Sequence, residues 1–170
     1  MEQGKLRGPI RRIAGIIELL MNYHPRGFDV LLGICEPPTD EEVHEMLDML
    51  RTKTDESIKT RSNYVNNAER IMWDAETFNS IIEEAGGWAR INKICNECRR
   101  LAPRYWEIVI NHIKYIGTMR VHHTSRLGML AARYACSVRT VQRYRREFSE
   151  RLAEFLLSPD VDMENFAQNF

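Results

Sequence analysis

The sequence predicts an all-α protein. Apolar residues recur at three- and four-residue spacing through most of the chain, which is the period of one helical face. Stretches with the two-residue alternation of a strand are nearly absent, so the helices have no sheet to cover. With 170 residues, of which 44% are apolar and 28% charged, the chain has the composition of an ordinary globular protein with a buried core.

The first predicted helix follows a basic stretch, and its apolar stripe consists of Ile13, Ile16, Ile17 and Leu20. It ends within residues 24–27, His-Pro-Arg-Gly, because proline and glycine interrupt helices. The apolar run 30–34 is too short for its period to distinguish a turn of helix from a strand.

The next helix is predicted after the double proline at 37–38. Thr39 or Asp40 caps it, and Glu41 and Glu42 lie in its first turn, where the helix dipole favours anions. Its buried side consists of Val43, Met46, Leu47 and Leu50. The polar stretch 51–59 that follows is a loop or an exposed helical segment.

The longest helix is predicted over Ile58–Ala85, where apolar residues recur every seven positions at Tyr64, Ile71, Phe78 and Ala85. Gly86 and Gly87 end it, as glycine does at helix C-termini. The repeat is typical of a dimer seam or of the inward side of a helix in a bundle. Asn67 and Asp74 favour the second interpretation, because a seam requires apolar residues at those positions.

The four cysteines are too few and too scattered for a disulfide framework, so we expect free thiols. Cys95 and Cys98 have the spacing of half a zinc site, which His112, His122 or His123 would have to complete. The two cysteines also continue the apolar side of a predicted helix. We therefore predict buried structural thiols, with no metal and no cofactor.

The most informative stretch of the chain is 130–144, LAARYACSVRTVQRY. The first helix of the pattern has one apolar face, formed by Leu127, Leu130, Ala131 and Tyr134. Ala135 is small at a sharp turn that usually holds glycine, and Ser137 caps the next helix. That helix buries Val141, Tyr144 and Phe148. This pattern predicts a helix-turn-helix.

The other side of the second helix carries the residue types that read DNA bases. Arginine matches the acceptor pair of guanine in the major groove, and glutamine matches the donor and acceptor of adenine. The predicted base-reading residues are Val138, Arg139, Gln142, Arg143 and Arg146. The predicted phosphate contacts are Ser137, Thr140, Arg145, Arg151, Arg126 and His123. The alternative is an amphipathic helix pair with solvated arginines, which leaves the small residues and the cap unexplained.

Residues 103–157 resemble the helix-turn-helix region of sigma-factor-like transcription regulators, especially small phage-encoded proteins that activate or antiterminate late transcription. The resemblance rests on LAARYACSVRTVQRYRREF and on the preceding PRYWEIVI and HIKY segments. It implies promoter DNA and RNA polymerase as partners. The chain departs from the pattern at 117–125, which is longer than the usual turn, and residues 1–100 have no such resemblance.

The net charge is zero, but the charges are segregated along the chain. Residues 88–151 hold 14 Lys or Arg against 4 Asp or Glu, whereas residues 27–87 hold 5 against 14. A basic block that coincides with the motif is typical of phosphate binding. The acidic block contacts a basic partner, shields the DNA-binding face, or keeps the protein in solution.

We therefore expect an acidic helical domain at 1–87, for partner contact or oligomerisation, a basic DNA-binding domain at 88–157, and an acidic tail at 158–170. The leading functional expectation is a sequence-specific transcription regulator that binds double-stranded DNA and acts with RNA polymerase. Two alternatives stay open. One is the small terminase subunit of a phage packaging machine, and the other is a helical module whose arginines bind an acidic protein.

Motifs for catalysis are missing from the sequence: there is no glycine-rich phosphate loop, no Gly-x-Ser-x-Gly elbow and no histidine pair at metal-binding helical spacing. We expect no enzyme and no catalytic residue. The absence of a signal peptide and of a long apolar segment predicts a cytoplasmic protein without a membrane partner. A homodimer is expected, because one helix-turn-helix contacts few base pairs.

Overall fold

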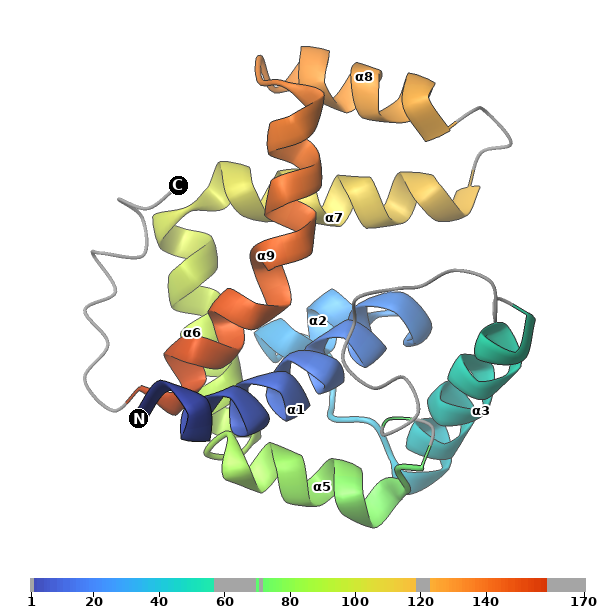
Figure 1. The fold of residues 1–170 in the computed structure, drawn as a ribbon, viewed down its shortest axis with the longest axis vertical. Coiled ribbons are helices and arrows are strands. Elements are labelled where there is room, and N and C mark those ends of the chain that lie inside the picture. Colours follow the sequence, from blue (N-terminus) through green and yellow to red (C-terminus); the bar gives the residue numbers. More distant parts are fainter. Residues whose placement is uncertain (1, 57–69, 71, 119–122, 159–170) are drawn as a thin grey trace.

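The computed structural model describes the backbone of residues 2–56, 70, 72–118 and 123–158, and the side chains of 7–52, 70, 72–114 and 127–158. Within these ranges the protein is all-α, as predicted, with eight helices and no strand (Figure 1). The helices are α1 (Glu2–Tyr23), α2 (Gly27–Leu32), α3 (Asp40–Glu56), α5 (Ala75–Glu84), α6 (Trp88–Leu101), α7 (Pro103–Thr118), α8 (His123–Arg133) and α9 (Val138–Leu157). None of them is both long and apolar enough to cross a membrane.

The N-terminal helices follow the predicted apolar stripes. The four stripe residues of α1 and the four of α3 are all buried. Thr39 is the cap of α3: its Oγ1 accepts a hydrogen bond from the Glu42 backbone N–H (3.2 Å), and its own N–H donates to Glu42 Oε2 (2.9 Å). The ambiguous run after α1 forms the short helix α2, which ends at Gly33 with φ of 77°.

The prediction of one continuous helix over Ile58–Ala85 is wrong, because the chain is interrupted just before Ala75. Residues 72–74 are not helical, and α5 begins only at Ala75. Asp74 is extended, and its Oδ1 accepts the backbone N–H of Thr77 at 2.8 Å, so it caps a new helix instead of continuing an old one. Trp73 is buried beside Gly15 of α1, where a Cβ would lie 2.9 Å from the indole. Residues 57–69 lie outside the described range.

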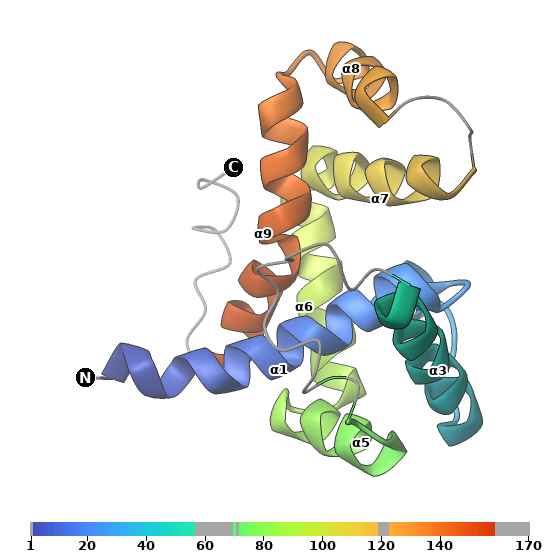
Figure 2. The same ribbon diagram turned by 45° about the vertical axis from the view of Figure 1, so that its right-hand side comes forward.

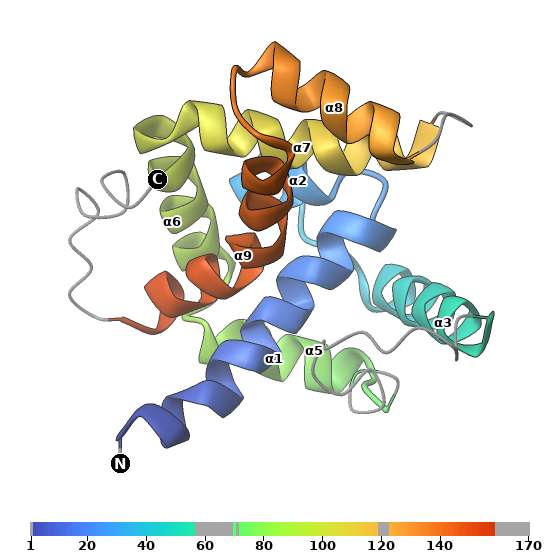
Figure 3. The same cartoon turned by 45° about the horizontal axis from the view of Figure 1, so that its top comes forward.

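One hydrophobic cluster runs from α1 to α9. Helix α1 contacts α2, α3, α5 and α9, and it passes beneath the lower half of α9 in two views (Figures 1 and 3). Aromatic rings from three helices meet here: Trp106 lies edge-on to Phe148 with centroids 5.0 Å apart, and Phe28 lies 6.0 Å from Trp106. The predicted domain boundary at residue 87 therefore does not coincide with a break in the core.

A second, smaller cluster lies at the other end of the molecule. It joins α7, α8 and α9 through Ile108, Leu127, Leu130, Ala131 and Val141. Helix α9 belongs to both clusters: its N-terminal half packs on α7 and α8, and its C-terminal half packs on α1 and α6. Figure 2 shows this division, with the upper half of α9 standing clear of the N-terminal helices. The position of α9 is therefore determined from both ends.

Candidate nucleic-acid interface

The connection from α8 to α9 is a tight turn centred on Ala135. This residue has φ of 50°, in the left-handed region that an alanine adopts at some energetic cost. The turn is closed by the Cys136 N–H, which donates to the Ala131 carbonyl at 2.9 Å. The prediction of a small residue at a sharp turn is thus confirmed, and the position is one that glycine would occupy without strain.

Helix α7 holds this turn from behind. The Arg104 guanidinium donates a hydrogen bond to the Tyr134 carbonyl, and the Asn111 side-chain amide donates to the Tyr134 hydroxyl. A cation at the C-terminal end of α8 also complements the helix dipole. The sequence pattern does not indicate this role for Arg104 and Asn111, because nothing local marks a residue whose partner lies more than 20 positions away.

Ser137 caps α9, as predicted. Its Oγ accepts the backbone N–H of Thr140 at 3.1 Å, and the two hydroxyl oxygens lie 2.9 Å apart. Because the two hydroxyls share one hydrogen between them, the pair keeps one O–H that points to other acceptors. The predicted phosphate contacts at Ser137 and Thr140 therefore reduce to a single available donor.

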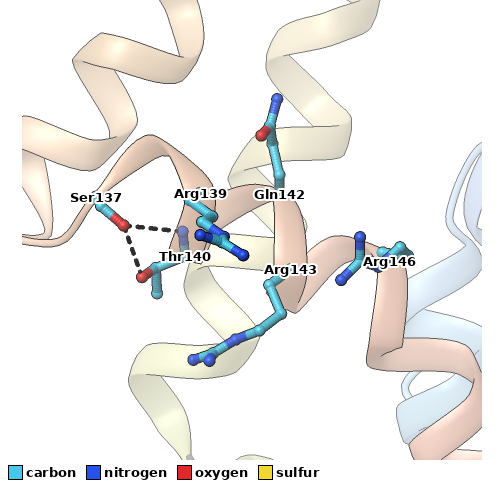
Figure 4. Close-up of a pocket in the computed structure, with 6 residues that line it drawn as sticks. All are labelled: Ser137, Arg139, Thr140, Gln142, Arg143 and Arg146. Atoms are coloured by element: carbon cyan, nitrogen blue, oxygen red, sulfur yellow. Dashed lines mark hydrogen bonds between the residues drawn. The ribbon is translucent and has the colours of Figure 1, made fainter.

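The five predicted base-reading residues occupy the first three turns of α9, and all five are exposed: Val138, Arg139, Gln142, Arg143 and Arg146. At about 100° per residue, the four polar ones fall within about 100° of each other around the helix axis. Together with Ser137 and Thr140 they line an open hollow of about 300 Å³ (Figure 4). We call these four side chains the α9 polar face.

The arginines of the α9 polar face are held only loosely. The Cζ atom of Arg143 lies over the ring of Tyr144, 5.5 Å from the ring centroid. The Nη2 atom of Arg146 lies 4.0 Å from Oε1 of the neighbouring Glu147, and the Arg146 side chain is 69% exposed. Exposed contacts of this kind contribute little, because water screens them. The guanidinium groups therefore keep most of their donors for an external ligand.

Arg145 does not belong to this surface. Its Nη1 and Nη2 donate to the two carboxylate oxygens of Glu18 at 2.8 and 2.9 Å, and its side chain is only 18% exposed. Ser149 and Asn22 add hydrogen bonds to the same carboxylate at 2.8 and 3.0 Å. Arg145 is therefore not available for the predicted phosphate contact, because its side chain points from α9 to α1 and is largely shielded from solvent.

Burial raises the pKa of the Glu18 carboxyl, but the hydrogen bonds and charge of Arg145, with further hydrogen bonds from Ser149 and Asn22, outweigh burial and hold this pKa below its ordinary value. Glu18 is thus an ionised carboxylate in a buried position. The sequence does contain a signal for this ion pair: Glu18 is a single acidic residue among the apolar residues of the first helix, and a buried charge requires a partner.

Of the remaining predicted phosphate contacts, Arg151 does not join this surface either. Arg151 pairs with Glu147 at 2.8 Å one turn before it and lies beyond the α9 polar face. The side chains of His123 and Arg126 lie outside the described residues. Within the described part of the chain, Arg139, Gln142, Arg143 and Arg146 are thus the exposed polar side chains that share one side of the first three turns of α9.

Cys95 and Cys98 lie in the main core, as the apolar side of α6 predicted. Burial raises the pKa of Cys95 well above its ordinary value and that of Cys98 to about 12, so both are neutral thiols at pH 7. The described residues contain no group of three or more His, Cys, Asp or Glu placed to hold a metal ion.

No family model matches the chain, and no curated protein or solved structure matches it significantly.

Proposed function

We propose that the protein is a transcription regulator that binds double-stranded DNA sequence-specifically through the N-terminal half of α9. The observation that supports this most directly is the exposure of Arg139, Gln142, Arg143 and Arg146 together on one side of a single helix. An α-helix fits the major groove, and these side chains match the patterns that guanine and adenine present there. Helices α7 and α8 pack on the opposite side of α9, so a duplex can approach without displacing them.

Charge favours the same surface. The basic block 88–151 contains the α9 polar face, and its excess of positive charge attracts phosphates over a distance of about 10 Å at moderate salt. Helices α3 and α5, which carry acidic residues in their first turns, lie at the far end of the molecule from the turn between α8 and α9 (Figure 1). We propose these acidic helices as the side that faces a protein partner such as RNA polymerase.

A binding experiment with matched variants tests the interface. Wild-type protein, Arg139→Ala/Arg143→Ala and the control Arg11→Ala/Arg99→Ala are titrated into a fluorescent duplex of random sequence at low salt. The control removes the same charge from exposed positions on α1 and α6. We expect the first variant to lose most of its affinity and the control to lose little, with a shallower salt dependence only in the first.

Failure to bind the duplex at low salt, or equal losses in both double variants, contradicts the proposal. Regulation is tested separately with a reporter whose promoter carries a site selected by the wild-type protein from a pool of random duplexes. We expect wild-type protein to change expression and Arg139→Ala/Arg143→Ala not to change it. Light scattering with and without duplex determines the oligomer: we propose a dimer, whereas a ring-sized assembly would favour a role in DNA packaging.

A further inference from the structure

The α9 polar face has a definite length, because α1 and acidic charge limit it. Ser149 and Ala153 follow Gln142 and Arg146 by two helical turns and point to the same side, but they are 1% and 0% exposed. Ser149 donates its hydroxyl to Glu18 of α1. Two turns after Arg143 stands the exposed Glu150, whose charge opposes phosphate. The part of α9 that a duplex can meet therefore ends at Arg146.

Within this length the four side chains are not equivalent. Arg139 and Arg146 are seven residues apart, so they lie within about 20° of one another along the middle of the face. Gln142 and Arg143 lie about 50° to either side of that line, and Figure 4 shows them pointing in opposite directions. When the helix lies in a major groove, the middle line of the face meets the base edges on the groove floor, and the two flanks face the sugar-phosphate walls.

The helix has one way to approach a groove. Helix α8 lies beside the N-terminal end of α9 and extends as far as that end in two views (Figures 1 and 2), so an end-on approach would bring α8 against the DNA first. Among the described residues, no other helix covers the exposed side of α9 along its first three turns, which favours an approach along its length. Positions along the helix axis then correspond to positions along the DNA.

The axial separation of Arg139 and Arg146 sets the spacing of the bases they meet. Seven residues at 1.5 Å each span about 10 Å along the groove. Because the groove winds around the DNA, neighbouring base pairs lie about 5 Å apart along it, more than their axial rise of about 3.4 Å. The two side chains are therefore about two base-pair steps apart. Arginine recognises guanine through O6 and N7, and guanine on either strand presents both atoms to the major groove.

We infer that the recognition site contains two G·C base pairs two steps apart, read by Arg139 and Arg146. This inference rests on the proposed function and adds the bases to it. Arg139 and Arg146 are then the specificity-determining residues. Arg143 meets a groove wall and contributes affinity. Gln142, on the other flank, adds an adenine preference at the pair between the two guanines. A dimer would recognise two copies of this unit.

Selection from a random duplex pool tests the inference, with the full-length chain as wild type, Arg139→Ala, Arg146→Ala and Arg143→Ala. We expect the wild-type motif to contain two guanines with one base pair between them. Each of the first two variants loses one of these guanine preferences, whereas Arg143→Ala keeps both. Replacing either guanine with 7-deazaguanine, which lacks the N7 acceptor, lowers wild-type affinity about 5- to 150-fold. The same replacement outside the motif has little effect.

The outcomes separate this inference from the proposed function. Enrichment of a motif without the two guanines, or at a different spacing, overturns the inference but leaves DNA recognition standing. Insensitivity of the motif to both Arg139→Ala and Arg146→Ala also overturns it, provided that circular dichroism shows the variants folded. If no duplex is enriched and none binds at low salt, both proposals fail.

Discussion

The ion pair between Glu18 and Arg145 joins the first helix to the middle of α9, and its removal tests how α9 is positioned. In Arg145→Ala the Glu18 carboxylate loses two charged hydrogen bonds and keeps those from Ser149 and Asn22 in a nearly dry environment. Removing one partner of a buried ion pair costs about 3–5 kcal/mol of unfolding free energy. For a chain of this size, that corresponds to a melting temperature lower by about 10 °C.

Urea unfolding followed by circular dichroism measures this loss. Glu18→Ala and the double variant complete a double-mutant cycle, in which the double variant should lose less than the sum of the two single losses. The control is Arg100→Ala, whose pair with Glu97 is exposed and should leave the unfolding free energy nearly unchanged. Additive losses in the cycle, or a loss in Arg145→Ala no larger than in the control, would refute a coupled buried pair.

The pH dependence provides a second measure. Because the folded state holds the pKa of Glu18 below its unfolded value, the pair stabilises the protein above the ordinary pKa of glutamate, and this contribution is lost as the pH falls through the folded pKa. In Arg145→Ala burial dominates and raises this pKa, so acidification relieves a buried charge. The difference in stability between wild type and Arg145→Ala should therefore shrink between pH 7 and about pH 4.

Two further predictions concern single positions. Ala135→Gly should raise the unfolding free energy by about 0.5 kcal/mol, since glycine removes the left-handed strain at some entropic cost. Ala135→Val should lower the unfolding free energy. If urea unfolding gave the opposite order of stability, the turn would not be left-handed. Asp74→Ala should lower the urea midpoint because the cap of α5 is lost, while Asp74→Asn, which retains a capping side chain, should not. Equal midpoints for the two Asp74 variants would argue against the cap.

Local patterns predicted a large part of the fold. The stripes of α1 and α3, the cap at Ser137, the turn at Ala135 and the buried thiols of α6 all follow from spacing and residue type within about 20 positions. The seven-residue repeat misled at Asp74, because the capping carboxylate offered the backbone another partner at that point. Periodicity alone does not record such competition.

Part of the candidate site also follows from local sequence, and part of it does not. The exposure of Arg139, Gln142, Arg143 and Arg146 follows from the stripe that α9 buries, so the sequence determined which side of the helix faces outward. The burial of Arg145 does not follow from it, since by helical position that residue lies at the edge between the two sides. Its partner Glu18 is 127 positions away, and only the packing of α1 on α9 brings them together.

The sequence by itself determined the helical class, several helix ends and the residue types on α9, because each depends on near neighbours along the chain and on the period of the helix. The tertiary structure decided which arginine is withheld from solvent, where the exposed side of α9 ends, and that one core joins the acidic and basic halves. These features depend on contacts between distant segments, and a buried charge or a covered face is defined only once the helices are packed together.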